Sequence, residues 1–189
     1  MTFEIESEII GKLVKNSVKI TSKSIQNELL SKGYGEKFDG DFILNSFEIL
    51  YLTYIKKLKI SKMNKNIPFD ELMNIYKKNE GDIFTKFLVY RDLRTRGYVT
   101  KKGFGFGSDF LVYDKGNFGQ KGAKYLIFAL NEGTQERISH IKKNIDQITR
   151  MGKEPIIAVI ERRGEVIYYK ISKINFLENN DSKIIDFNF

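Results

Sequence analysis

Two side chains capable of acid–base or charge-stabilising chemistry stand beside turns in the second half of this 189-residue chain. Tyr113 ends the segment Gly107-Ser-Asp-Phe-Leu-Val-Tyr113, and Lys153 precedes the apolar segment Pro155-Ile-Ile-Ala-Val-Ile160. A tyrosine hydroxyl can exchange a proton, and a lysine ammonium can stabilise negative charge that develops on phosphorus. Taken singly, each residue is more simply a strand-end aromatic or a solvated charge, so only their joint placement favours a site.

Hydrophobic periodicity predicts the elements that position these two residues. A helix over 83–96, with Phe84 among its core-facing residues, ends at Gly97, and a second helix carries isoleucines at helical spacing and ends near Gly152. The strands are expected at 98–102, 109–113, 124–130, 156–160 and 165–170. These elements predict an α+β fold, whose nuclease-like C-terminal domain has a central mixed sheet flanked by helices.

The first part of the chain reads as a smaller mixed α/β domain. Short strands are expected between Phe3 and Ile20, at 42–44 and near 58–60, with helices that begin after Ser22, after Asn45 or Ser46, and at Pro68. We therefore divide the chain into residues 1–80, residues 81–172 and a tail over 173–189. The tail is apolar enough to pair with a strand or a subunit through the following residues: Ile184, Ile185, Phe187 and Phe189.

Composition limits the chemistry that the chain can perform. Thirty-two Lys and Arg against 24 Asp and Glu give a net charge of +8, which attracts polyanions such as RNA. Zero cysteines and one histidine exclude thiolate zinc sites, cysteine nucleophiles and sites with two imidazoles, so we expect no metal and no cofactor. The chain shows no signal-peptide layout and no apolar run long enough for a membrane helix, so we expect a soluble, cytoplasmic protein without a membrane partner.

Two motifs point toward other chemistry and are better explained structurally. The segment Gly103-Phe-Gly-Phe-Gly107 lacks the following helix, lysine and hydroxyl residue of a phosphate-binding loop, so a strained hairpin is the simpler prediction. Asp109 suggests a metal-dependent nuclease, but no second carboxylate stands next to a strand lysine in the usual order.

A basic helix that ends at Gly97, a glycine-rich hairpin and a return strand that ends at Tyr113 resemble the catalytic domain of the archaeal tRNA-intron splicing endonucleases. The resemblance covers residues 84–170 well and the N-terminal half only in size and in the region 42–59. It implies that Tyr113 is the general base and Lys153 the charge stabiliser of a three-residue site completed by a histidine acid. Such a site cuts RNA without metal and leaves 2′,3′-cyclic phosphate and 5′-hydroxyl ends.

This chain departs from the family pattern at the acid. The resemblance places the histidine near Lys121 and Gly122, where the sequence reads Gly119-Gln-Lys-Gly-Ala-Lys-Tyr125. A lysine ammonium titrates near 10.4 and is a poor acid at neutral pH, and losing a general acid costs about 10² to 10⁴ in rate. The only histidine, His140, falls on a predicted helix surface. Asp146 stands where the family has a base-clamping arginine, unless a shift of the match brings Arg150 there.

These observations predict a largely non-catalytic, structural subunit of a heterotetrameric tRNA-splicing endonuclease. Its partners would be a related catalytic subunit and precursor tRNA with bulge-helix-bulge sites. Candidate RNA-binding residues are Arg91, Arg94, Arg96 and Arg150, although the helix arginines are more simply dipole partners. The resemblance also implies that an acidic loop, with Glu132 and Glu136, inserts into a basic pocket of an opposing subunit. The alternatives are a catalytic subunit and a basic RNA-binding module without a splicing role.

Overall fold

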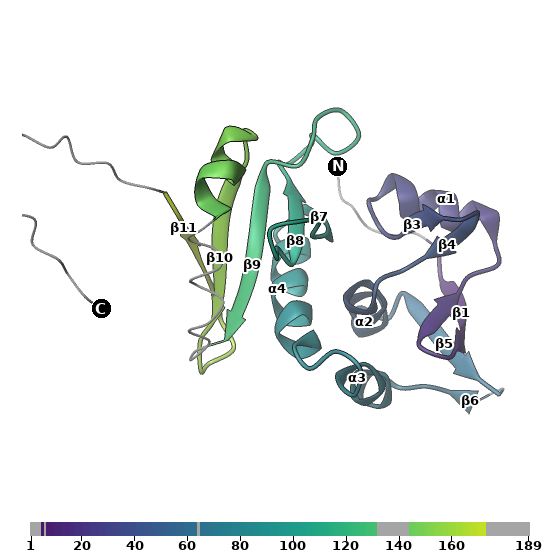
Figure 1. The fold of residues 1–189 in the computed structure, drawn as a ribbon. Helices are drawn as coiled ribbons and strands as arrows, with labels where there is room; N and C mark the ends of the chain where they lie inside the picture. Colours follow the sequence, from purple (N-terminus) through teal and green to yellow (C-terminus); the bar gives the residue numbers. More distant parts are fainter. Residues whose placement is uncertain (1–4, 6, 64, 132–143, 173–189) are drawn as a thin grey trace, which may run out of the picture.

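The second half of the molecule is a mixed sheet with one long helix packed on it. The computed structural model describes residues 5, 7–63, 65–131 and 144–172. The sheet has the order β11-β10-β9-β8-β7, and only β9 and β10 pair in parallel (Figure 1). The elements are α4 (Ile83–Thr95), β7 (Val99–Lys102), β8 (Phe110–Tyr113), β9 (Tyr125–Asn131), β10 (Glu154–Ile160) and β11 (Val166–Lys170), with a helical stretch over 144–150.

The first half contains a four-stranded sheet of order β2-β1-β5-β6, a separate β3–β4 hairpin and short helices. Parallel pairing of β1 with β5 brings these two strands to the centre of that sheet. The elements are β1 (Ile9–Val14), β2 (Ser17–Lys19), α1 (Lys23–Ser31), β3 (Glu36–Phe38), β4 (Asp41–Ile43), α2 (Ser46–Tyr54), β5 (Leu58–Lys62), β6 (Lys65–Asn66) and α3 (Phe69–Lys77).

One hydrophobic core runs through both halves, because α2 lies between the N-terminal sheet and α4 (Figure 1). The Phe47 ring on α2 packs 4.8 Å from the Tyr90 ring of α4 and 5.1 Å from the Phe110 ring of β8. All three side chains are buried. Burial of rings this large provides much of the free energy that holds the halves together.

The structure confirms the predicted α+β fold and corrects some of its details. Phe84 is 52% exposed and does not face the core. The buried face of α4 includes Ile83, Phe87 and Tyr90, which recur at helical spacing, and Phe84 lies outside that face. The β3–β4 hairpin was not predicted, and the polar segment Lys62 to Asn66 pairs as the β5–β6 hairpin. None of the helices over the described ranges is both long and apolar enough to cross a membrane.

The glycine-rich hairpin between β7 and β8 is strained, as predicted. Gly105, Phe106 and Gly107 all have positive φ, at 76°, 55° and 72°. For Phe106 this conformation is uncommon, since it costs a non-glycine residue about 1–2 kcal/mol. A strand follows the hairpin, so the segment is not the start of a helix that could cradle phosphate.

Candidate functional site

Tyr113 and Lys153 come to the same edge of the C-terminal sheet. β8 is antiparallel to β9, with Val112 opposite Tyr125, and β10 is parallel to β9, with Glu154 opposite Tyr125. Extending both registers by one residue places Tyr113 and Lys153 on either side of Lys124, which directly precedes β9. The sheet thus sets a row of one phenol and two ammonium groups across three strands.

Side-chain alternation puts Tyr113 and Lys153 on one face of the sheet. Leu111 and Ile157 pack against the small cluster around Ile148, which lies in the helical stretch 144–150. Tyr113 follows Leu111 by two positions, and Lys153 lies four positions before Ile157. The two candidate residues therefore belong to the face that 144–150 covers, opposite the face that packs on α4.

The two candidate side chains are half-buried, and each has a local contact. The Tyr113 ring meets the Phe118 ring edge-on, with centroids 5.0 Å apart and an interplanar angle of 89°. The Lys153 Nζ donates a hydrogen bond of 2.5 Å to the carbonyl oxygen of Ala123. The same loop, over 114–123, therefore holds both residues in place.

The loop carries no acid at the position where the resemblance expects one. Lys121 and Gly122 are both exposed. A Cβ added to Gly122 would meet nothing within 4 Å, and its φ lies outside the left-handed region that favours glycine. A larger residue would therefore fit at 122, so the local structure explains neither the glycine nor the missing imidazole.

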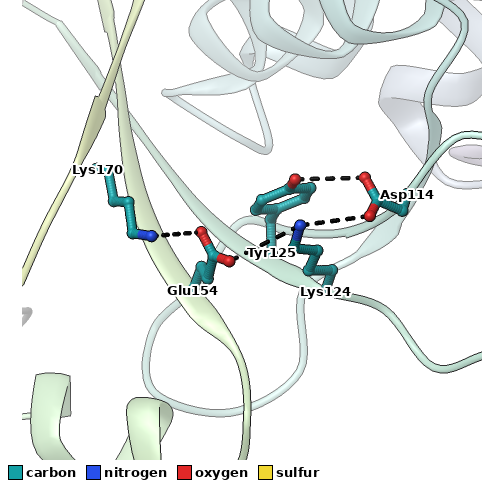
Figure 2. Close-up of polar contacts among 5 residues, drawn as sticks. All are labelled: Asp114, Lys124, Tyr125, Glu154 and Lys170. Carbon is teal, nitrogen blue, oxygen red and sulfur yellow. Dashed lines mark hydrogen bonds and ion pairs between the residues drawn. The ribbon is translucent and has the colours of Figure 1, made fainter.

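A network of charged side chains borders the row at the start of β9 and β10 (Figure 2). Lys124 Nζ lies 3.3 Å from Asp114 and 3.8 Å from Glu154, and Lys170 Nζ lies 2.9 Å from Glu154. Tyr125 donates its hydroxyl to Asp114 at 3.3 Å. Tyr125 and Asp114 raise the pKa of Lys124, and Lys170 lowers the pKa of Glu154. The pKa shifts of Lys124 and Glu154 thus both favour the charged forms of these two groups.

A basic cleft of about 970 Å³ opens between the two halves of the molecule, beside the loop that holds Tyr113. It receives four cationic side chains, and over the described part of the chain no carboxylate lines it. Four aromatic residues form much of its walls. These lining residues are Lys57, Arg94, Arg96, Lys115, Tyr34, Tyr51, Tyr98 and Phe118.

Arg94 lies at the bottom of this cleft and is only 7% exposed. Its guanidinium lies 3.7 Å from the centroid of the Tyr34 ring, its Nε donates to the Tyr90 hydroxyl, and its Nη2 donates to the Lys32 carbonyl oxygen. Its Nη1 has no hydrogen-bond partner among the described residues. Leaving a buried charged donor unpaired costs about 1–3 kcal/mol or more, and because this nitrogen is itself buried, a group in the cleft cannot reach it unless its neighbours move.

The other predicted RNA-binding arginines are spread over the surface. Arg91 lies over the Tyr54 and Phe87 rings, and Arg96 forms an ion pair with Asp92 at 2.6 Å. Arg150 is exposed near the end of the helical stretch 144–150. The structure therefore does not gather the four arginines into one patch. Arg94 is mostly buried, because α4 turns its side chain inward against Tyr34 and Tyr90, and its contact with RNA stays a prediction.

Several predicted residues lie outside the described part of the chain. They are the loop carboxylates Glu132 and Glu136, the histidine His140, and the tail residues Ile184, Ile185, Phe187 and Phe189. Asp146 is described and is exposed.

Asp109 has a structural place. It is 7% exposed, accepts a hydrogen bond from the backbone N–H of Ala129 at 2.8 Å, and lies 3.7 Å from Lys86. The described residues contain no group of three or more His, Cys, Asp and Glu side chains arranged to hold a metal ion. The carboxylate of Asp109 therefore links β8 to β9 and α4.

Sequence reasoning missed Glu48, a carboxylate at the junction of the two halves with no exposed surface. It accepts hydrogen bonds from the backbone N–H groups of Gly35, at 3.0 Å, and Asn45, at 2.8 Å. Burial raises its pKa, while Lys101 acts in the opposite direction. The Asn45-x-x-Glu48 spacing is a helix-capping pattern, so the bond to Asn45 was predictable. The bond to Gly35, 13 residues away, was not.

The fold and site together define a two-part α+β protein of the nuclease type, with a tyrosine and a lysine at one sheet edge and a basic cleft beside them. Residues 83–168 match the family model of the tRNA intron endonuclease catalytic C-terminal domain, and residues 9–73 match that of its N-terminal domain. The chain belongs to the tRNA intron endonuclease family.

Two relatives show how much of the chain this similarity covers. A tRNA-splicing endonuclease of Methanococcus vannielii is 33% identical over 164 residues, which span 86% of this chain and 93% of that protein. One from Pyrococcus horikoshii is 32% identical over 154 residues, which span 82% of this chain and 89% of that protein. The similarity therefore extends over both halves, including the N-terminal half.

Proposed function

We propose that this chain is a structural, non-catalytic subunit of a cytoplasmic tRNA-splicing endonuclease. In this proposal it assembles with a related catalytic subunit into a heterotetramer that removes introns from precursor tRNA at bulge-helix-bulge sites. The observation that carries the proposal is the incomplete row at the sheet edge. Tyr113 and Lys153 are in register. The position that the resemblance gives to the acid is taken by Lys121 and Gly122.

Metal-independent RNA cleavage needs three actions at once. A base removes the 2′-hydroxyl proton, a cation stabilises the charge on phosphorus, and an acid protonates the departing 5′-oxygen. Tyr113 and Lys153 supply candidates for the first two. For the third, the loop supplies no histidine, and the position that the resemblance gives to the acid is taken by the exposed residues Lys121 and Gly122.

The basic cleft supports the assembly part of the proposal. A carboxylate-bearing loop of a related subunit would find four cationic side chains lining the cleft. In the reciprocal contact, Glu132 and Glu136 of this chain would enter the equivalent cleft of the partner.

A mixing experiment tests the assigned role. This chain is combined with a related subunit that carries all three catalytic residues but is inactive alone, and bulge-helix-bulge RNA is added with chelator. We expect cleavage only in the mixture, and we expect Tyr113→Phe in this chain to leave that activity unchanged. Cleavage that requires Tyr113 of this chain would instead support the catalytic alternative.

A second experiment tests the cleft. The double variant Lys57→Gln/Lys115→Gln removes two cations from the cleft, and the matched control Lys62→Gln/Lys65→Gln removes two exposed cations from the β5–β6 hairpin. We expect the first variant to weaken assembly at least about tenfold by analytical ultracentrifugation, because charged interface pairs contribute about 1.5 kcal/mol or more. Equal behaviour of the two variants would exclude the cleft as the docking pocket.

A further inference from the structure

The N-terminal sheet has one face that the proposed function does not use. Its inward face packs toward α2 and joins the hydrophobic core through Ile9, Leu13, Val18, Leu58 and Ile60 (Figure 1). Strand alternation points the residues between these to the opposite face of the sheet. That outward face is open to solvent over the described part of the chain, since even its apolar residues on β1 are 67% and 53% exposed.

The registers of the sheet place four polar residues in one row across this outward face. Lys12 on β1 lies opposite Lys19 on β2 and opposite Ser61 on β5. Ser61 in turn lies opposite Asn66 on β6. Because neighbouring strands are about 4.8 Å apart, the row extends over about 14 Å. Each of the four side chains carries a hydrogen-bond donor, and the two lysines add positive charge.

The two ammonium groups of the row are not balanced by carboxylates. Lys12 and Lys19 are exposed, and neither forms an ion pair with a described residue. Glu8, which lies on the same side of the sheet, is engaged by Lys59 at 2.6 Å. Like charges directly opposite each other on paired strands repel. An anionic group bound between Lys12 and Lys19 would relieve that repulsion.

We infer that this row binds the phosphate backbone of RNA. Phosphate oxygens accept hydrogen bonds from lysine, serine and asparagine side chains without any reading of base sequence, and neutralising lysines release the counterions of the RNA. The exposed Ile10 and Val14 flank Lys12 and would suit a protein partner, but the row between them is cationic, and the chain as a whole carries +8. RNA is therefore the better match for this face. The inference depends on the proposed function only for the identity of the RNA as precursor tRNA.

The test compares two pairs of lysines from the same sheet. Lys12→Gln/Lys19→Gln removes both charges of the row. The matched control Lys62→Gln/Lys65→Gln removes another directly opposed pair, which belongs to the other face because Lys62 follows the buried Ile60 by two positions.

Binding is measured by fluorescence anisotropy with two labelled RNAs. One is a bulge-helix-bulge RNA whose cleavage-site nucleotides are 2′-deoxy, so that it cannot be cut, and the other is a duplex hairpin without bulges. We expect Lys12→Gln/Lys19→Gln to bind both RNAs at least about fivefold more weakly and to lower the salt dependence by about two phosphate contacts. The control should change binding less than about twofold.

A third variant separates loss of charge from loss of folding. Lys12→Arg/Lys19→Arg keeps both charges and should bind the two RNAs like the unaltered protein. The inference is wrong if the two glutamine variants bind alike, if the loss is confined to the bulge-helix-bulge RNA, or if the unaltered protein binds neither RNA at low salt. Because these readouts need neither cleavage nor a partner, they are separate from the tests of the structural-subunit role.

Discussion

The junction between the two halves and the loop edge of the C-terminal sheet differ in how tightly neighbouring residues hold their side chains. At the junction, a fully buried Glu48 has both carboxylate oxygens hydrogen-bonded, and Arg94 is fixed by Tyr34 and Tyr90. At the edge, Tyr113 and Lys153 are half-buried, and Gly122 has open space around it. Side-chain contacts thus constrain the residues at the junction more than those in the loop at the edge.

The comparison shows that core packing and site chemistry constrain different residues of the same fold. Buried charged groups must be satisfied or the fold loses several kcal/mol. An exposed glycine in a loop such as Gly122 carries no comparable requirement. A chain can therefore meet every structural demand of the family and still lack one reacting group.

The largest expected effect comes from adding the missing group at the edge. Gly122→His introduces an imidazole where a side chain fits, and we expect RNA cleavage in chelator to rise by about 10² to 10⁴, the usual contribution of a general acid. The activity should decline above about pH 7, as a group with a pKa near 6.5 loses its proton. Gly122→Phe, which adds a ring that has no ionisable proton, is the control. Equal cleavage rates for the two variants would show that a general acid is not the missing group.

The junction should respond to the loss of a single oxygen. Glu48→Gln keeps the shape but turns one acceptor into a donor that faces an N–H group, so we expect the free energy of unfolding to fall by about 2–4 kcal/mol. Urea unfolding followed by circular dichroism measures the change. Glu161→Gln, which alters an exposed carboxylate, should stay within about 0.5 kcal/mol. A loss no larger than that for Glu48→Gln would contradict the comparison drawn here.

Alanine substitutions at two glycines distinguish the stability cost of close packing from that of backbone strain. Gly33 and Gly116 have nearly equal φ, at 76° and 78°, but a Cβ on Gly33 would lie 2.3 Å from Val99 Cγ1, whereas one on Gly116 would meet nothing within 4 Å. Both alanine variants should lose about 1–2 kcal/mol from the left-handed conformation, and Gly33→Ala about 1–3 kcal/mol more from overpacking. Equal thermal unfolding midpoints of the two alanine variants would show that the residues around Gly33 accommodate the added methyl group without loss of stability.

The smallest expected effect is a pH dependence from Glu48. Burial raises its folded-state pKa above the ordinary value of 4.5, so the folded protein binds this proton more readily than the unfolded chain does. The contribution of Glu48 protonation to the free energy of unfolding is fully present below pH 4.5 and is lost as pH rises through the raised pKa of Glu48. The stability difference between the unaltered protein and Glu48→Gln should therefore be larger at pH 5 than at pH 7. If the stability difference between the two proteins became smaller on acidification, the predicted direction of the pH dependence would be wrong.

The sequence predicted most elements of the C-terminal half, because their signals are local. Gly97 ends α4 with a φ of 85°, and the glycine-rich turn over 105–107 lies between β7 and β8. The β3–β4 hairpin was missed although its turn, Asp39-Gly40, has the positive φ values of 50° and 83° that this dipeptide favours. The sequence motifs around Tyr113 and Lys153 indicated that these residues belong together, and the strand registers bring them to one end of the sheet.

Long-range features could not be read in the same way. The inward turn of Arg94 depends on Tyr34, and the burial of Glu48 depends on Gly35, partners that lie far away in sequence. The bridge from Glu154 to Lys170 likewise needs the register between β10 and β11. Periodicity assigns residues to faces of an element, but it does not state which element packs against that face.

The most direct test of the central claim is the activity of the unaltered chain by itself. Purified protein is incubated with bulge-helix-bulge RNA in the presence of chelator, and the ends of any product are identified. We predict no cleavage, since the described residues at the edge beside Tyr113 include no histidine. Efficient cleavage that persists in chelator and disappears with Lys121→Met would contradict the account, because Lys121 would then be acting as the acid.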